Sequence, residues 1–287
     1  MAISINKVDE AVRQQIVQDY KTGKSMRQIE QDYKVTRSTV SKYLTNLGIK
    51  TVAGNHHRLY NHNEFYFHDI QAEHPAYWLG FMFADGYIIN NEERYGQDQF
   101  GLSLALEDKE MINLFKQDLE ATNPIHEYER NTHTKGQPLC RIQLTSQQTV
   151  DDLIFYGCTK QKSRTLQPPK NLPEKVIHHF IRGFFDGDGS ITKVKNERYK
   201  ITDGYAYGIN ITTTYAMAEW LQYFFEMGSI VKDNRRETTY YYSLGGHRQV
   251  IKFYHILYDT ATIYMPRKFL RFQELLNKYD ESQGSNV

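Results

Sequence analysis

Two matching segments constrain this chain more than any other feature of its sequence. Residues 78–86 read WLGFMFADG and residues 181–189 read IRGFFDGDG. Each is an apolar run with small residues four positions apart, and each ends in Asp-Gly. Residues at that spacing share one face of a helix, and small ones let two helix backbones approach closely. The two segments therefore predict a pair of tightly packed helices.

The same segments predict a site at one end of the helix pair. Contact is expected at the small residues Gly80, Ala84, Gly183 and Gly187. Asp85 and Asp188 then reach the same end, where two carboxylates repel each other unless a proton or a cation lies between them. Mg²⁺ accepts carboxylate, backbone carbonyl, water and phosphate oxygens as ligands. A divalent metal between Asp85 and Asp188 is therefore the expected arrangement.

Around these segments the chain repeats one order of elements. Residues 75–165 and 166–279 each read αββαββα from their hydrophobic periodicity, which makes the fold class α+β with two pseudo-symmetric repeats. A further helix is expected near residues 267–278, and residues 280–287 are expected to be a frayed tail.

The N-terminal part reads differently, as an all-α domain. Residues 8–22, 26–33 and 37–47 are predicted helices, with Ser25 and Thr36 as N-caps. The predicted core of this small domain consists of Ile29, Val35, Val40 and Leu44. Three short helices around a tight turn at residues 34–36 indicate a helix-turn-helix domain over residues 1–50. The polar segment 51–74 is expected to be a linker.

Charge is segregated along the chain, although the formal net charge is only +1. Residues 21–50 hold seven Lys and Arg against two acids, and residues 229–273 hold eight against three. Residues 92–129 reverse this, with ten acids against three bases. Such segregation fits a nucleic-acid partner on one face of the protein.

The location of the protein is predicted from what the sequence lacks. Cys140 and Cys158 have no metal-site spacing and read as buried free thiols of a reducing compartment. No apolar run reaches membrane length and no signal peptide opens the chain. We therefore expect a cytoplasmic protein with no membrane partner.

The paired segments resemble the two motifs of single-chain LAGLIDADG homing endonucleases, and the resemblance covers residues 75–278. It implies saddle-shaped antiparallel sheets and a monomer. The penultimate acid of each motif corresponds to Asp85 and Asp188, and the carbonyls of Ala84 and Gly187 would also face the metals. The sixth motif position, often acidic, is Phe83 in the first copy and Asp186 in the second. That position is not the metal ligand, so the difference leaves the expectation intact.

The resemblance also implies an activity and further residues. The expected reaction is Mg²⁺-dependent hydrolysis of both strands of a long, asymmetric DNA site, leaving short 3′ overhangs, with Mn²⁺ as a substitute metal. A basic residue near each metal corresponds to Lys162 and Lys268, which both follow the last helix of their repeat. Alternating side chains of a β-ribbon can reach base edges in the major groove. The expected base readers are Asn90, Gln97, Gln99, Lys193, Lys195, Arg198, Asn210, Thr212, Arg235, Arg236 and Tyr240.

The helix-turn-helix is expected to add DNA contacts at the start of its third helix. The residues expected to face DNA there are Thr36, Arg37, Ser38, Thr39, Ser41 and Lys42. The alternative for this domain is a small bundle that only packs on the rest of the chain.

Other interpretations of the sequence compete with the nuclease. A calcium loop starting at Asp186 is rejected because its sixth place, Ile191, must be Gly. Zinc at the five His of residues 51–74 is disfavoured by their irregular spacing. An intein is discarded because the ends lack splice-junction residues. A non-cleaving DNA-binding regulator is disfavoured because both motif carboxylates are present, and an intron RNA maturase on the same fold remains open.

Overall fold

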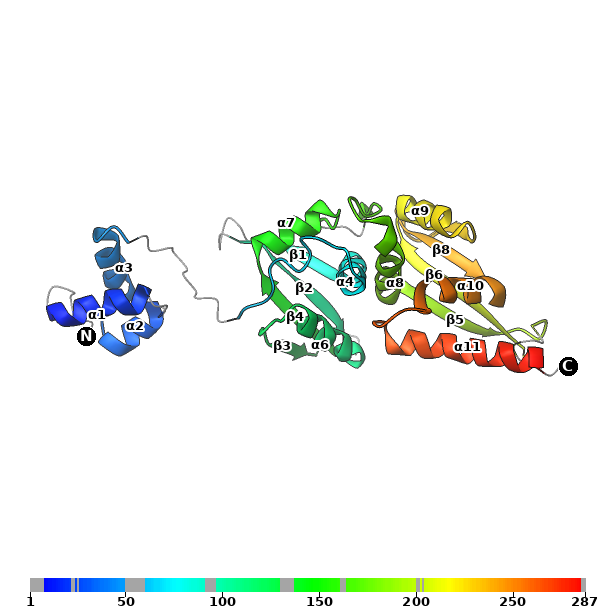
Figure 1. Ribbon diagram of the computed structural model, residues 1–287, viewed down its shortest axis with the longest axis horizontal. Helices are drawn as coiled ribbons and strands as arrows, with labels where there is room; N and C mark the ends of the chain where they lie inside the picture. Colours follow the sequence, from blue (N-terminus) through cyan, green and yellow to red (C-terminus); the bar gives the residue numbers. More distant parts are fainter. Residues whose placement is uncertain are drawn as a thin grey trace. The chain divides into compact units, whose positions relative to one another are not determined.

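The computed structural model describes residues 8–21, 24, 26–49, 60–90, 97–129, 137–160, 164–199, 202 and 204–284 (Figure 1). They divide into two compact units, Met1–Asn61 and His62–Val287. Each unit has its own hydrophobic core. Among the described residues, no helix combines the length and the apolar character needed to cross a membrane.

The N-terminal unit contains three helices, α1 (Glu10–Lys21), α2 (Met26–Tyr33) and α3 (Arg37–Asn46). The turn before α3 is made by Lys34, whose φ of 55° is left-handed, and α3 is capped by the Thr36 hydroxyl, which accepts a 3.3 Å hydrogen bond from the Thr39 amide. Ser25, the predicted cap of α2, lies outside the described residues. The buried core of the unit consists of Ile16, Tyr20, Ile29, Val35, Val40 and Leu44.

The first repeat begins with α4 (Glu73–Ala84), the helix of the first motif. Gly86 follows Asp85 and opens the sheet directly. The remaining elements of this repeat are β1 (Gly86–Ile89), β2 (Gln99–Ala105), α6 (Lys109–Asp118), β3 (Ile125–Tyr128), β4 (Leu139–Thr145) and α7 (Gln147–Phe155). The order is αββαββα, as the sequence predicts.

The second repeat has the same order and begins with α8 (Ile177–Asp188), the helix of the second motif. Its other elements are β5 (Gly189–Lys195), β6 (Tyr205–Thr213), α9 (Tyr215–Phe225), β7 (Ser229–Lys232), β8 (Tyr240–Gly245) and α10 (His247–Tyr258). One more helix, α11 (Pro266–Gly284), follows the repeat and extends six residues beyond its predicted end.

Each repeat contains one antiparallel four-stranded sheet, and the strand orders match. They are β1-β2-β4-β3 and β5-β6-β8-β7. Side chains alternate between the two faces of a strand. In β6, Ile209 and Ile211 are fully buried under the helices, whereas Asn210 between them is only half-buried. Each sheet thus has one face covered by helices, and we call the other its open face.

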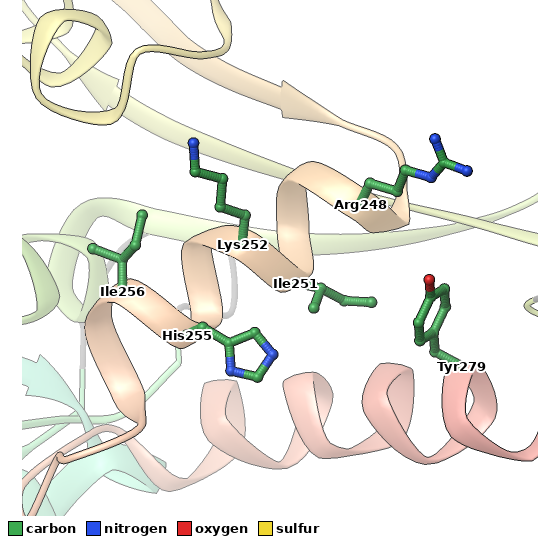
Figure 2. A pocket seen from close by; sticks show the side chains of 6 residues that line it. All are labelled: Arg248, Ile251, Lys252, His255, Ile256 and Tyr279. Atoms are coloured by element: carbon green, nitrogen blue, oxygen red, sulfur yellow. The ribbon is translucent and has the colours of Figure 1, made fainter. Parts of the chain in front are cut away.

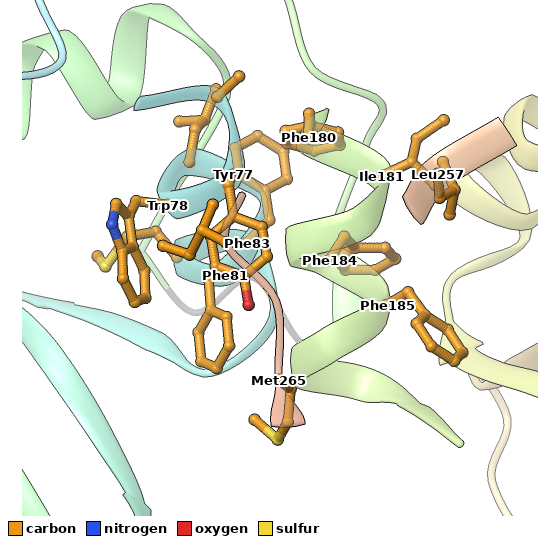
Figure 3. Close-up of a cluster of buried hydrophobic side chains, with 14 of the residues drawn as sticks. Tyr77, Trp78, Phe81, Phe83, Phe180, Ile181, Phe184, Phe185, Leu257 and Met265 are labelled. Carbon is orange, nitrogen blue, oxygen red and sulfur yellow. The ribbon is translucent and has the colours of Figure 1, made fainter. Parts of the chain in front are cut away.

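The two motif helices lie side by side between the two sheets (Figure 1). Aromatic side chains fill the space around them (Figure 3), and Phe83 of α4 meets Phe180 of α8 edge to face at 4.9 Å. A single core runs through both repeats. Burying these large apolar surfaces is the dominant stabilising term for the unit.

The predicted linker over residues 51–74 was too long at its C-terminal side. Phe67 and Ile70 are fully buried in the main core, and the Thr149 hydroxyl donates a 3.0 Å hydrogen bond to the carbonyl of Glu64. The polar composition of the segment gave no indication that Phe67 and Ile70 are buried, or that its backbone is hydrogen-bonded to α7.

Candidate active site at the end of the motif helices

Helices α4 and α8 touch backbone to backbone at two glycines. A methyl group on Gly80 would collide with the carbonyl oxygen of Phe180, and one on Gly183 would collide with the carbonyl oxygen of Tyr77. These positions are equivalent in the two motifs, so the contact is symmetric. Neither site has room for any larger residue.

The same close approach brings the motif carboxylates to one end. A methyl group on Gly187 would collide with the side chain of Ala84 and would lie 3.1 Å from Oδ2 of Asp85. Asp85 caps the C-terminus of α4, and Asp188 is the last residue of α8. The Asp85 carboxylate therefore lies against the backbone one residue before Asp188.

Asp188 also lines a hollow of about 220 Å³ that opens beside the helix ends. Its lining includes three consecutive threonines, at residues 212–214 where β6 ends and α9 begins, and Arg236 from the β7–β8 connection. The hollow thus combines a carboxylate, hydroxyls and a guanidinium, groups that suit a phosphate with its metal.

A second hollow, of about 480 Å³, lies between α10 and α11 (Figure 2) and includes none of the predicted site residues.

Lys268 reaches the end of α8 from α11. It is only 3% exposed, and its Nζ donates to the carbonyl oxygens of Phe185 and Asp186 at 2.7 Å and of Gly187 at 3.4 Å. Burial lowers the pKa of Lys268 to about 8, although the charge of Asp186 opposes this and Asp85 and Asp188 do so more weakly. The cation therefore lies within the field of both motif carboxylates. Lys162, its predicted counterpart, lies outside the described residues.

Asp186 has a different environment from Asp188. It is fully buried and accepts hydrogen bonds from the Tyr77 hydroxyl (2.8 Å), the Tyr258 hydroxyl (2.7 Å) and the Met265 amide (2.7 Å). Burial raises the pKa of the Asp186 carboxyl, while Lys268 and the three donors favour its charged form. Asp186 thus ties the segment before α11 to both motif helices.

A second buried group, which was not predicted from the sequence, also holds the segment before α11 to the motif helices. Arg182 of α8 is fully buried and pairs with Glu73 at the start of α4. Its guanidinium also donates to the carbonyl oxygens of Ile263 (2.9 Å) and Leu257 (2.7 Å), and the Thr262 amide donates to Glu73 at 2.7 Å. The arginine inside an otherwise apolar motif does indicate a buried ion pair, because a buried charge needs a partner.

The oxygen groups at the helix ends fit a hard divalent cation. Asp85 lies against Gly187, and Asp188 lines the hollow beside the helix ends; carboxylate and carbonyl oxygens are the ligand types that Mg²⁺ prefers. Within the described part of the chain, no group of three or more His, Cys, Asp or Glu side chains is arranged for a metal.

Comparison with known proteins finds a family that the second repeat resembles. A family model described as LAGLIDADG endonuclease matches residues 181–275. Residues 181–275 are therefore similar in sequence to a LAGLIDADG endonuclease domain. The match runs from the second motif through Lys268, and it includes Asp186, Gly187 and Asp188. Comparison with curated proteins gives no match.

Solved structures extend the LAGLIDADG fold to both repeats. The meganuclease I-AabMI, solved bound to uncleaved DNA, superposes with a TM-score of 0.53 at 15% identity, covering 74% of this chain and 92% of that one. The homing endonuclease I-SmaMI, solved bound to cleaved DNA, gives a TM-score of 0.48 at 16% identity, covering 74% and 90%. At these identities the likeness to I-AabMI shows the fold.

Some predicted base readers lie on the open faces of the LAGLIDADG sheets. By strand register, Asn210 and Thr212 lie on the open face of the second sheet, and Gln99 lies on that of the first. The Asn210 carboxamide accepts a 2.6 Å hydrogen bond from the Ser243 hydroxyl.

Other predicted readers lie on the wrong face. Lys193, Lys195 and Tyr240 share the register of the buried residues under the helices. Lys193 pairs with Glu274 of α11, and Tyr240 packs edge to face on Tyr215 of α9 at 5.3 Å. The prediction was wrong because it rested on the charge of these residues and not on the two-residue alternation that assigns each side chain to a face.

The remaining predicted readers lie in connections between strands. Arg235 is held by Asp233 at 3.3 Å, while Arg236 lines the hollow beside Asp188. Asn90 directly follows β1, Gln97 lies two residues before β2, and Arg198 lies three residues after β5. Asp98, just before β2, is 2% exposed and pairs with Lys160 at 2.7 Å.

The residues predicted to contact DNA in the N-terminal unit lie at the start of α3. Arg37, Ser38 and Lys42 are exposed, and Arg37 pairs with Glu30 at 2.9 Å. The hydroxyl groups of Thr36 and Thr39 are hydrogen-bonded to each other, with their oxygens 2.7 Å apart. Ser41 is half-buried on the same helix.

The open face of the first sheet holds residues that the sequence reading missed. Arg141, Gln143 and Tyr87 all lie on this face by register. Their signal was the strict alternation of polar residues with Cys140, Ile142 and Leu144 in β4, whose inward side chains are buried.

Proposed function

We propose that this chain is a site-specific DNA endonuclease that cuts both strands of a long, asymmetric site with a divalent metal. The observation that carries the proposal is the Asp85 carboxylate against Gly187, one residue before Asp188. This juxtaposition arises from two equivalent motifs, one of which lies in a LAGLIDADG endonuclease domain. Both carboxylates are retained, which favours a nuclease over a non-cleaving regulator.

In this proposal each residue at the helix ends has a definite task. Asp85, Asp188 and the carbonyls of Ala84 and Gly187 hold Mg²⁺, with Mn²⁺ as a substitute. Bound metal lowers the pKa of an attacking water and offsets charge on the phosphate and the leaving oxygen. Lys268 fixes the carbonyls of Asp186 and Gly187 through its hydrogen bonds. Its positive charge would also stabilise the scissile phosphate.

DNA binding would use both units of the chain. The open sheet faces supply base contacts, and one motif carboxylate per repeat serves one strand, leaving short 3′ overhangs. The N-terminal unit, through Arg37, Ser38 and Lys42, would raise the effective concentration of the nuclease at its site. One chain carries both repeats, so a monomer suffices.

The test is cleavage of fragmented source genomic DNA with Mg²⁺, followed by sequencing of the new ends. The controls are the Asp85→Asn/Asp188→Asn double variant, a chelator, and Asp280→Asn, which changes an exposed carboxylate on α11. Wild type and Asp280→Asn should produce ends at one recurring long site, and both other samples should not.

Ends that persist in the double variant would refute the proposed metal site. If wild-type protein makes no new ends but retains RNA of a host intron, the fold serves as a maturase, and the nuclease proposal fails.

A further inference from the structure

The open face of the first sheet carries a connected row of polar side chains from three strands. The Arg141 Nε donates to the Tyr87 hydroxyl at 2.6 Å and an Arg141 terminal nitrogen, Nη2, donates to Gln143 Oε1 at 2.6 Å. Gln143 in turn donates to Gln99 at 2.8 Å, and Gln99 donates to Thr145 at 3.3 Å. The row is thus fixed before any ligand arrives.

Arg141 is the residue that this row positions. Its guanidinium carbon also lies 4.3 Å from the centre of the Tyr87 ring. Contacts with Tyr87 and Gln143 use Nε and Nη2, and neither uses Nη1. Nη1 thus keeps both of its hydrogens and Nη2 keeps one, which are enough donors for the pair of hydrogen bonds with which arginine reads guanine O6 and N7. A guanidinium held in advance loses little rotamer entropy on binding.

Strand register identifies the equivalent positions in the second sheet. Leu102 pairs with Ile142 as Ile211 pairs with Tyr242, so Arg141 corresponds to Tyr241. By the same register, the positions that replace Tyr87, Gln143, Gln99 and Thr145 are Ser190, Ser243, Gly208 and Gly245. The Tyr241 hydroxyl is already directed to Asp233, at 2.8 Å. The second sheet therefore has no equivalent of the positioned arginine.

The open face of the second sheet instead presents methyl groups. Val194 is 61% exposed and Val231 is 48% exposed, although both are β-branched apolar residues. Thr192, Ala206 and Thr212 lie on the same face by register. Among the strand residues of this face, none is Lys, Arg or Gln. In the major groove, such apolar side chains recognise thymine by contact with its C5-methyl group.

We propose that the two repeats read their half-sites by different chemistry. Arg141, positioned by Tyr87 and Gln143, recognises a guanine in the half-site bound by the first repeat. The second repeat recognises thymine methyl groups through the exposed methyl groups around Val194 and Val231. This inference rests on the proposed function, since it assumes that both open faces meet duplex DNA.

Binding selection from a random duplex library tests the guanine contact, using the full chain without divalent metal so that no DNA is cut. Wild type should enrich a site with one strongly preferred guanine. Arg141→Ala should lose roughly 10- to 100-fold preference at that position alone. Arg141→Gln should change the preference there from guanine to adenine, because a carboxamide pairs with adenine N6 and N7. A switch of base cannot result from unfolding.

The outcomes separate the two proposals. If wild type enriches no sequence, the proposed function itself fails. If wild type enriches a site and both Arg141 variants enrich the same site with its guanine, the inference is overturned and the proposed function stands. Tyr87→Phe, which keeps the ring but removes the hydroxyl, should weaken the guanine preference without changing the base.

Deoxyuridine tests the methyl contacts, since it differs from thymidine only by the absent C5-methyl group. The Arg141-sensitive position marks the half-site of the first repeat. Replacing single thymines in the other half should weaken binding by about fourfold for each contacted methyl group, and replacements beside the guanine should have no effect. Equal effects in the two halves, or none in either, would overturn the second part of the inference.

Discussion

Lys268 donates a 2.7 Å hydrogen bond to the backbone carbonyl of Asp186, two residues before the carboxylate of Asp188. Carbonyls at a helix C-terminus carry partial negative charge and have no partners inside the helix. A buried cation on α11 therefore stabilises the end of α8 where the motif carboxylates meet. Structure and chemistry are coupled at this contact, and the first two predictions address it.

Removing the Lys268 charge should slow DNA cleavage in a pH-dependent way. Burial lowers the pKa of Lys268 to about 8, so the cation is present below pH 8 and is lost as pH rises through that value. Lys268→Met should reduce the cleavage rate by roughly 100-fold at pH 7. The ratio of wild-type to variant rates should fall above pH 8, because wild type loses the same charge there. Lys252→Met, at an exposed position of α10, is the matched control and should leave the rate unchanged.

Asp186 and Lys268 should be energetically coupled. Asp186→Asn leaves the Lys268 cation buried without its counter-charge, and should lower the free energy of unfolding by about 3 kcal/mol or more. In the double variant with Lys268→Met, the loss should be smaller than the sum of the single losses, by about 0.5–3 kcal/mol. Urea unfolding of the four proteins gives the coupling energy. Strict additivity would show that the two groups do not interact.

Gly183→Ala should destabilise the second unit by about 1–3 kcal/mol or more, because the added methyl group collides with the Tyr77 carbonyl in the helix pair. The matched control is Gly245→Ala, where an added methyl group meets nothing within 4 Å. Calorimetry should show a lower melting temperature for the first variant only. Equal melting temperatures for Gly183→Ala and wild type would mean that the helices are farther apart than described.

Deleting residues 1–50 should weaken DNA binding and shorten the footprint, while Mg²⁺-dependent cleavage at the same site remains. The expectation follows from the separate core of the N-terminal unit and the exposed Arg37, Ser38 and Lys42. Footprinting and cleavage assays on the deletion variant measure both properties. An unchanged footprint would mean that the N-terminal unit does not contact DNA.

The element order could be predicted because each element has a local signal. Hydrophobic periodicity and small residues at intervals of four gave both motif helices, and a single hydroxyl gave the start of α3 at Thr36. The face of a strand residue was harder to assign, because a shift of one position reverses it. Lys193 was thus assigned to DNA, although it pairs with Glu274, and Arg141 was missed, although it lies on the open face.

Contacts between distant segments could not be predicted at all. Nothing local to Glu73 indicates that it meets Arg182, 109 positions later. Nor does the sequence around Met265 show that its amide binds Asp186. These pairings depend on the position of the segment before α11, which only the packed structure fixes.

The salt bridge between Glu73 and Arg182 has a consequence for the ancestry and engineering of such chains. The glycine contacts are self-complementary, as the interface of a two-fold homodimer must be. The ion pair is not, because the residue equivalent to Glu73 in the second repeat is Val176, and that equivalent to Arg182 in the first is Leu79. Two copies of the second repeat would each bury an arginine without its acid. Chimaeras that exchange one half should therefore keep Glu73 and Arg182 together across the junction.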